Sequence, residues 1–295
     1  MGKALFDNSK RAREVFERAD AALGRPLSKL CFEGPLSELT LTANTQPALV
    51  TTSIATLEAL REALPELPEP ECVLGHSLGE YSALVAAGAL SLEQAVRLVE
   101  LRGRAMQDAV PAGEGAMAAI IGGDIAQVEE LCRDAAEGEI LACANFNSPG
   151  QVVIAGGVKA VERASKLASD RKLKAIALPV SAPFHCSLMR PAAQAVADAL
   201  SQIQVVQPNF PVIANFDAEL NTDAARVREL LVNQVCSPVL WQQSIARARQ
   251  LGVTAAFEVG PGKILAGLVK RIDKELRVLG LSEPHHFLEA SGFIG

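Results

Sequence analysis

The sequence is poor in aromatic residues, carries a net negative charge, and spaces its cysteines unlike a metal site. Only 4% of the 295 residues are aromatic and the net charge is -6, whereas nucleic-acid-binding domains need basic patches and stacking rings. The six cysteines include no C-x-x-C pair, which zinc fingers and thioredoxin-like redox motifs require. We therefore expect no nucleic-acid partner and no bound metal, with the cysteines as small core residues in a reducing compartment.

Signals for secretion and for membrane insertion are also missing. Residues 1–6 contain no hydrophobic stretch after their charge, and Phe6 stands where a myristoylation pattern needs Ser or Thr. Residues 140–158, one of the two longest uncharged runs, contain Asn145, Asn147 and Gln151, which a bilayer would not tolerate. With 49% hydrophobic residues, the chain has enough apolar surface for a large core. We expect a cytoplasmic, soluble protein.

Helices and strands are expected to alternate, which indicates an α/β fold with a parallel sheet covered on both faces. In the larger part we expect helices at residues 9–23, 47–64, 91–108, 191–203, 223–235 and 238–250 and from residue 263, and strands at 72–74, 212–215 and 254–259. The pattern changes between Pro111 and Pro183. There we expect a strand–helix–strand–strand–helix–strand order, typical of a ferredoxin-like split unit, at residues 116–121, 125–136, 139–145, 151–155, 158–169 and 174–180.

Ser77 lies in the pattern of a nucleophile elbow, Val73-Leu-Gly-His-Ser-Leu-Gly-Glu80. A short apolar strand runs into a tight turn and then a helix, and we expect Gly75 and Gly79 to allow their close approach. Such a turn strains the serine, and the helix N-terminus behind it offers N–H groups to an oxyanion. A chance G-x-S-x-G in a Gly-rich turn is the alternative, but the flanking strand and helix favour the elbow.

A serine nucleophile needs a base, and the chain has four histidines. We expect His285 and His286 to be solvated in a polar tail, and the side chain of His76 to diverge from that of Ser77. His185, in a loop between a strand and a helix, is the remaining candidate. Taken alone, it would be interpreted as a loop histidine bound to a backbone carbonyl. A working Ser77 makes His185 the predicted base.

Arg102 is the strongest indication of the substrate. On the helix that starts at Ser91, apolar residues recur at spacings of three and four, and Arg102 falls on this buried stripe. A guanidinium there is costly unless it is paired. One alternative is a structural ion pair with an acid elsewhere in the chain. The other is a fixed fork for bidentate contact with a carboxylate, which would select an acyl group ending in a carboxylate. A plain esterase has no use for such a fork.

Five separated motifs stand in order over nearly the whole chain: Gly75-His-Ser-Leu-Gly-Glu-Tyr-Ser-Ala-Leu84, Val96-Arg-Leu-Val-Glu-Leu-Arg-Gly103, Gly115-Ala-Met-Ala-Ala-Ile-Ile-Gly122, Asn145-Phe-Asn-Ser-Pro-Gly-Gln-Val-Val-Ile-Ala-Gly156 and Glu258-Val-Gly-Pro-Gly-Lys263. Together they resemble the bacterial malonyl-CoA:acyl-carrier-protein transacylases. The resemblance implies an α/β-hydrolase-like catalytic core with a parallel sheet, formed by residues 1–112 and 182–295. Residues 113–181 would form the inserted ferredoxin-like (βαββαβ) subdomain.

The resemblance also implies residue roles. Ser77 would carry the malonyl ester, and His185 would act first as base and then as acid. The family orients its histidine with the backbone carbonyl of a glutamine that matches Gln234, and the backbone N–H of Leu78 would be one oxyanion donor. Arg102 would bind the malonyl carboxylate.

Two more side chains are assigned to the substrate site by this resemblance, Phe184 and Met106. In modular synthases, a Phe beside the histidine and a Leu after the serine accompany malonyl rather than methylmalonyl choice, and this chain has Phe184 and Leu78. A bulky ring would exclude a branching methyl, although hydrophobic discrimination is worth only about 1–3 kcal/mol per methylene.

The implied reaction is a ping-pong transfer of malonyl from malonyl-CoA to the phosphopantetheine thiol of acyl carrier protein. It would supply fatty-acid synthesis and need no metal or redox cofactor. Carrier proteins are acidic, so the basic segment 163–174 and Lys270-Arg271 are candidate docks, although charge runs are usually just solvated helix faces. A monomer is the expected state.

The chain departs from the family at its start. Members begin with a buried strand that ends in a Gly-Gln-Gly-Ser-Gln loop, and residues 1–6 match the segment beyond it. The glutamine of that loop gives the second oxyanion N–H, whose loss costs about a hundred- to thousandfold in rate. We therefore expect this form to be poorly folded or weakly active, with the gene product starting upstream. Two rival functions remain: a serine hydrolase (thioesterase or patatin-like lipase) and a non-enzymatic remnant.

Overall fold

The computed structural model describes residues 1–180 and 182–293. Its helices, including two short 3-10 helices (η), are α1 (Lys3–Asn8), α2 (Lys10–Leu23), α3 (Leu27–Glu33), α4 (Leu36–Leu39), α5 (Thr42–Ala63), α6 (Gly79–Ala86), α7 (Leu92–Asp108), α8 (Ile125–Ala136), α9 (Val158–Asp170), η1 (Ser187–Met189), α10 (Arg190–Ser201), α11 (Ala224–Cys236), α12 (Trp241–Gln250), α13 (Ile264–Ile272), η2 (Pro284–His286) and α14 (Phe287–Phe293). Its strands are β1 (Val73–Leu74), β2 (Gly115–Ile121), β3 (Leu141–Ser148), β4 (Gln151–Gly157), β5 (Lys174–Ala177), β6 (Val212–Ile213), β7 (Leu220–Asn221), β8 (Ala255–Val259) and β9 (Arg277–Leu281).

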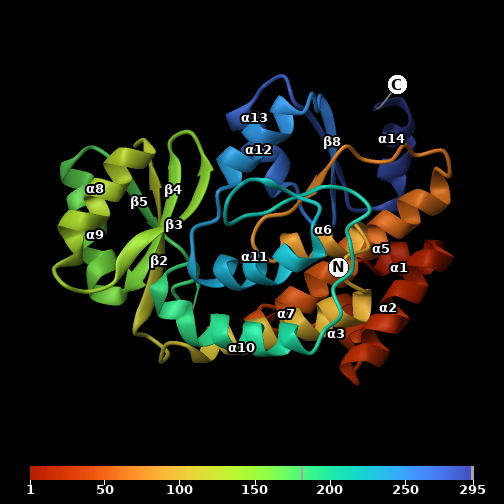
Figure 1. Ribbon diagram of the computed structural model, residues 1–295, viewed down its shortest axis with the longest axis horizontal. Coiled ribbons are helices and arrows are strands. Elements are labelled where there is room, and N and C mark those ends of the chain that lie inside the picture. Colours follow the sequence, from red (N-terminus) through yellow and green to blue (C-terminus); the bar gives the residue numbers. More distant parts are fainter. Residues whose placement is uncertain (181, 294–295) are drawn as a thin grey trace.

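The larger part of the molecule is helical around two short sheets (Figure 1). Strand β1 pairs in parallel with β6, β6 pairs antiparallel with β7, and β8 pairs in parallel with β9. The apolar faces of α2, α5, α7 and α10 contribute to one buried core, as their helical spacing of apolar residues predicts. The expected α/β fold is confirmed, although its strands form antiparallel as well as parallel pairs where we expected a parallel sheet. The carboxyl end of β1 leads into the start of α6.

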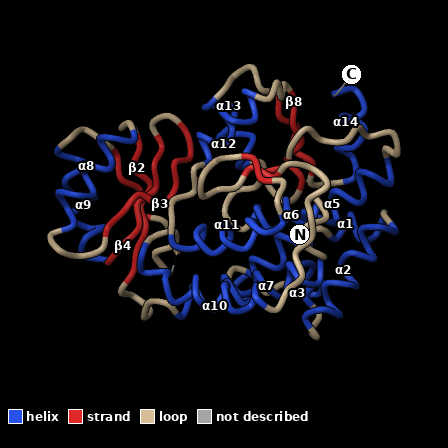
Figure 2. Tube along the Cα trace, viewed as in Figure 1, coloured by secondary structure: helices blue, strands red, loops and turns tan. Residues whose placement is uncertain are grey.

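The small subdomain lies at one end of the molecule, at the left of Figure 1. Its strands follow the order β3-β4-β2-β5 and every neighbouring pair is antiparallel. Figure 2 shows helices α8 and α9 together on the outer side of this sheet. The predicted order of strands and helices is confirmed, and the order β3-β4-β2-β5 is that of a ferredoxin-like sheet. The exact limits of the two domains remain a prediction.

Helix α5 begins earlier than its sequence indicated. We expected it to start at Pro47, but it starts at Thr42 and contains Pro47 in its second turn. The added turn packs against α7, where a Cβ on Gly103 would lie only 2.7 Å from the carbonyl oxygen of Thr42. Tertiary packing therefore stabilises a first turn that local propensity does not predict.

The C-terminal region is more ordered than expected. The prediction of a polar tail around His285 and His286 was wrong, because strand β9 precedes them and helix α14 follows. The ring nitrogen Nδ1 of His286 accepts backbone N–H bonds from Ser282 and Glu283, each at 3.2 Å. Strand β9 is short, and its pairing with β8, a partner distant in sequence, fixes its position.

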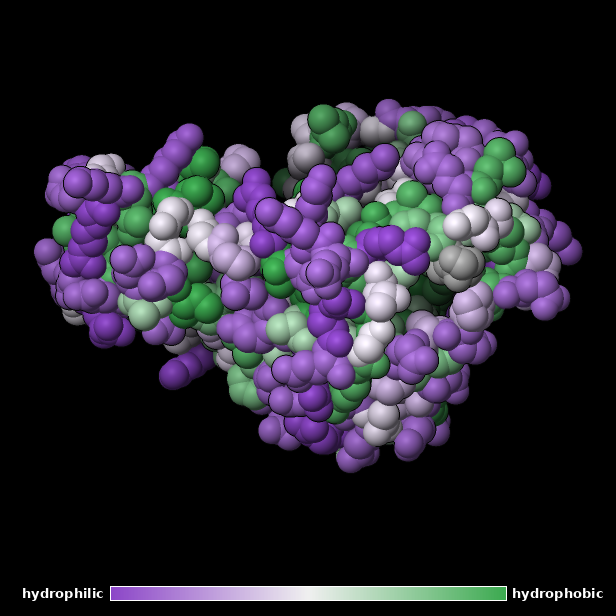
Figure 3. Space-filling model, turned by 90° about the horizontal axis from the view of Figure 1, so that it is seen from above, coloured by the Kyte–Doolittle hydropathy of each residue, from purple (hydrophilic) through white to green (hydrophobic). Residues whose placement is uncertain are grey.

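Among the described residues, no helix is both long enough and apolar enough to cross a membrane. On the face shown in Figure 3, hydrophilic side chains cover most of the surface and hydrophobic ones form separate patches.

Candidate active site

The turn between β1 and α6 has the geometry of an elbow. Ser77 sits at its apex with a φ of 52°, in the left-handed region that side chains disfavour. A Cβ on Gly75 would lie 2.1 Å from the carbonyl carbon and oxygen of Gly79, so only glycine fits there. A Cβ on Gly79 would meet nothing within 4 Å, and our expectation that Gly79 is needed for the close approach was wrong.

The side chains of Ser77 and His185 are in contact. Ser77 Oγ lies 2.7 Å from His185 Nε2, and His185 Nδ1 lies 2.9 Å from the backbone carbonyl oxygen of Gln234. A carbonyl can only accept a hydrogen bond, so Nδ1 carries the proton and Nε2 is free to accept one from the serine. His185 also has a positive φ, 60°. The arrangement is that of a nucleophile and its general base, oriented by a neutral acceptor.

Arg102 points from α7 into the same site. Helix α7 is fixed at its N-terminus by a capping box between Ser91 and Gln94. The arginine is 1% exposed and its guanidinium donates to Gln46 Oε1 at 2.8 Å, to Gln234 Oε1 at 3.0 Å and to Ser77 Oγ at 3.1 Å.

The guanidinium is not neutralised by an acid. Within residues 1–180 and 182–293, no carboxylate forms a salt bridge with it, and Glu80 attracts it only through space. It lies 5.6 Å from the ring centroid of Tyr81, an additional cation–π contact. Burial lowers the pKa of Arg102, but a guanidinium stays charged at any pH at which proteins fold. The structural ion pair that the sequence left open is therefore not formed, and the cation faces the serine.

Burial of the site and the charge of Arg102 control the pKa of His185, the proposed base. Burial, followed by the charge of Arg102, lowers the pKa of His185 to about 3, against the opposing effect of the bond to the Gln234 carbonyl. The imidazole is thus neutral at physiological pH, which is the state that accepts a proton.

Three polar side chains in the site were missed by sequence reasoning: Gln46, Glu80 and Asn215. Glu80 and Asn215 are buried and Gln46 is 5% exposed. The one signal that was available was the position of Glu80 on an otherwise apolar helix face beside Tyr81 and Leu84. Gln234 was predicted through its backbone carbonyl alone, yet its side chain also contacts Arg102.

The other predicted residues lie around this centre. Leu78 is the N-cap of α6, directly after the serine. Phe184 is half-buried and packs against two apolar clusters, and Met106 is 1% exposed in the core one turn beyond Arg102. The Nε2 of His76 instead lies 2.8 Å from Asn147 Oδ1 in the small subdomain. The roles of Leu78, Phe184 and Met106 remain predictions.

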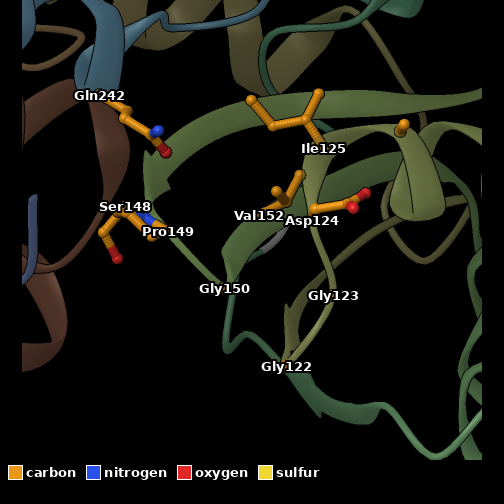
Figure 4. A pocket seen from close by; sticks show the side chains of 10 residues that line it. Gly122, Gly123, Asp124, Ile125, Ser148, Pro149, Gly150, Val152 and Gln242 are labelled. Atoms are coloured by element: carbon orange, nitrogen blue, oxygen red, sulfur yellow. The ribbon is translucent and has the colours of Figure 1, made fainter.

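A separate pocket of about 540 Å³ lies at the edge of the small subdomain (Figure 4). The N-terminus of α8 and the turn after β3 form its walls, and its lining includes Asp124, Ser148 and Gln242. Its lining includes none of the predicted site residues, so we assign it no part in the chemistry at Ser77.

Known proteins are similar to this chain over most of its length. A family model described as acyl transferase domain matches residues 1–286. A malonyl CoA-acyl carrier protein transacylase of Bacillus subtilis is 47% identical over 286 residues, which covers 96% of this chain and 89% of the relative.

Two solved structures are also similar. The acyl-carrier-protein-S-malonyltransferase of Bartonella henselae has a TM-score of 0.95 and 45% identity, covering 98% of this chain and 93% of that chain. The second is a type II PKS acyl-carrier protein in complex with its malonyl-transacylase. It has a TM-score of 0.95 and 42% identity, covering 98% of this chain and 94% of that chain.

The geometry of the elbow predicts that alanine substitutions at its two glycines have different effects on the free energy of unfolding. Gly75→Ala should lower the free energy of unfolding by at least about 1–3 kcal/mol, because the new methyl group overlaps the backbone of Gly79. Gly79→Ala should leave that free energy unchanged or raise it by up to about 1 kcal/mol, because alanine favours a helix. Urea unfolding followed by circular dichroism measures both. Equal losses in the two variants would contradict the assigned turn geometry.

The electrostatics predict the titration of His185. The ring signals of His185 are followed by nuclear magnetic resonance and assigned by their loss in His185→Ala. Because the pKa of His185 is about 3, these signals should remain those of a neutral imidazole from pH 8 to pH 5. Arg102→Ala removes the adjacent cation and should move the midpoint upward, because imidazolium then costs less. A midpoint near the ordinary value of 6.5 in the unmodified protein would contradict this account.

Proposed function

Because the chain belongs to the acyl transferase domain family and, within it, to the malonyl-CoA:acyl-carrier-protein transacylases, we propose that it transfers malonyl through an ester on Ser77. The observation that carries the proposal is the contact of one buried cation, Arg102, with the nucleophile itself. A carboxylate-bearing acyl group is the substrate that such a cation selects.

In the first half of the reaction, Ser77 Oγ attacks the thioester carbonyl of malonyl-CoA while His185 Nε2 accepts its proton. The backbone N–H of Leu78, the residue after Ser77, would donate to the developing oxyanion. Collapse of the tetrahedral intermediate breaks the carbon–sulfur bond. His185 returns the proton to the departing thiolate, and coenzyme A leaves.

In the malonyl ester, the cation has a new partner. Ser77 Oγ is then part of the ester and accepts a hydrogen bond less strongly, so the Arg102 N–H that it held is available to the distal carboxylate. An acetyl ester offers no such group. Arg102 would therefore favour the malonyl ester over the acetyl ester on Ser77. Exclusion of branched acyl groups by Phe184 and Met106 would be a separate effect.

In the second half, the phosphopantetheine thiol of acyl carrier protein attacks the ester, with His185 as base, and takes the malonyl group. In the basic segment proposed as a dock for the carrier, Lys172 and Lys174 are exposed, at the turn before β5 and in that strand, and Lys270-Arg271 remains the second candidate. Arg163 is already bound to Glu137 and Glu139.

No step of this scheme requires a metal or a redox cofactor, because the attacking, proton-transferring and anion-binding groups are side chains and backbone amides. We place the reaction in the cytoplasm, since all six cysteines are free thiols. Fatty-acid synthesis is the pathway we propose. One structural neighbour is a malonyl-transacylase in complex with a type II PKS acyl-carrier protein. The two pathways would therefore differ in the carrier protein and not in the chemistry at the serine.

The proposal predicts a malonyl adduct that depends on Arg102. Mass spectrometry after incubation with malonyl-CoA should show a gain of one malonyl group on Ser77. Arg102→Ala should abolish malonyl loading and spare or improve acetyl loading from acetyl-CoA. Arg104→Ala, on the same helix with an exposed side chain, is the matched control and should load malonyl normally.

The outcomes separate the rival functions. Equal loss of malonyl and acetyl loading in Arg102→Ala would mean that the arginine is structural. Rapid release of free malonate without a stable adduct would favour a serine hydrolase. Absence of any adduct in the unmodified protein would favour a remnant without activity.

A further inference from the structure

Glu80 is a buried carboxyl that the reaction scheme leaves without a role. It lies in the first turn of α6, three residues after Ser77, and is 2% exposed. Its Oε2 accepts two hydrogen bonds, from the backbone N–H of Asn215 at 3.0 Å and from Gln234 Nε2 at 2.9 Å. Those two partners come from segments more than 130 residues away in the sequence, so Glu80 joins three parts of the chain at one oxygen atom.

The same two partners hold both peptide groups of Ser77. The backbone N–H of Ser77 donates to Asn215 Oδ1 at 2.6 Å, and its carbonyl oxygen accepts from Gln234 Nε2 at 2.8 Å. Asn215 Nδ2 also donates to the carbonyl of Gly75 at 2.7 Å, one residue before the turn. A left-handed backbone costs a non-glycine residue about 1–2 kcal/mol. These hydrogen bonds therefore offset the strain that places Ser77 Oγ at the apex.

We propose that Glu80 is a positioning residue for the nucleophile: it fixes Asn215 and Gln234, which in turn hold the backbone of Ser77 in its strained conformation. The inference rests on the proposed function of Ser77 as the nucleophile. Through Gln234 it extends to the rest of the site, because the same residue orients His185 with its backbone carbonyl and Arg102 with Oε1.

The position of Glu80 also suggests a different role, a counter-charge for Arg102. The two side chains do not touch, and the amide of Gln234 lies between them with its oxygen toward Arg102 and its nitrogen toward Glu80. Burial raises the pKa of Glu80 to about 7, so the neutral and charged forms coexist near neutral pH. Positioning needs an acceptor oxygen, which both forms provide, whereas a counter-charge needs the anion. Glu80→Gln keeps the oxygen and removes the charge, and so distinguishes the two roles.

The test compares Glu80→Ala and Glu80→Gln with a matched control, Glu62→Ala. Glu62 likewise accepts two hydrogen bonds at one oxygen, from Ser9 Oγ and from the backbone N–H of Arg11, but at the far end of α5. Three measurements are made on each full-length variant. They are kcat and KM for malonyl loading, the rate at which a small fluorophosphonate labels Ser77, and the thermal unfolding midpoint.

Glu80→Ala should lower kcat and the labelling rate together by about 10- to 100-fold, the cost of misplacing a reacting atom, while KM for malonyl-CoA changes little. Glu80→Gln should restore most of both rates. Glu62→Ala should keep the kcat and the labelling rate of the unmodified protein, with an unfolding midpoint similar to that of Glu80→Ala. A merely structural glutamate would lower the midpoint without this split between kcat and KM.

Labelling of Ser77 at the unmodified rate in Glu80→Ala would overturn the proposal. A Glu80→Gln variant as slow as Glu80→Ala would also overturn it, and would favour the role of Glu80 as a counter-charge for Arg102. Should Glu80→Ala fail to fold, Asn215→Ala breaks the same chain of contacts at the next residue. It should slow labelling to a similar degree, and unchanged labelling there would also refute the inference. An unmodified protein that labels at Ser77 but never takes up malonyl would refute the proposed function and leave the role of Glu80 standing.

Discussion

The site depends on a buried guanidinium that forms no salt bridge with any carboxylate of the described residues, 1–180 and 182–293. Burying such an ion costs several kcal/mol unless its donors are satisfied, and Arg102 donates to neutral oxygens of Gln46, Gln234 and Ser77. These neutral acceptors bind Nη1 and Nη2 without cancelling the charge, whereas the buried Nε has no hydrogen-bond partner among the described residues. The positive potential is therefore retained at Ser77. There it adds to burial, the larger cause, in lowering the pKa of His185, and it would stabilise negative charge on Ser77 Oγ and attract an anionic substrate. Had the cation been paired with a carboxylate, all three effects would be weaker.

Gln234 connects the three groups to which we assign the chemistry, Ser77, His185 and Arg102. Its backbone carbonyl orients His185, and its side-chain oxygen accepts a hydrogen bond from Arg102. Its side-chain nitrogen donates to the backbone carbonyl of Ser77 and to the carboxyl group of Glu80. The orientation of its amide is fixed, because a guanidinium can only donate and a backbone carbonyl can only accept. One helix, α11, thereby keeps nucleophile, base and cation in register. The strained backbones of Ser77 and His185 persist because the surrounding contacts determine them.

Much of this could be predicted from local sequence. The elbow, the capping box at Ser91 and the alternation of the small subdomain are short-range patterns, and the structure has them where expected. The inward position of Arg102 followed from helical spacing alone. Two expectations failed because they depended on distant partners. Helix α5 gains its first turn from packing on α7, and β9 is fixed by its pairing with β8. The contacts of Asn215 and Gln46 join residues far apart in the sequence, and no periodic pattern marks them.

The role of Arg102 is tested most directly by a crystal structure of the protein after reaction with malonyl-CoA, with the ester trapped on Ser77. We expect the distal carboxylate to lie about 3 Å from the Arg102 guanidinium in bidentate contact, while Gln234 keeps its bond to His185. A carboxylate directed into solvent, with Arg102 bound only to Gln46 and Gln234, would contradict it.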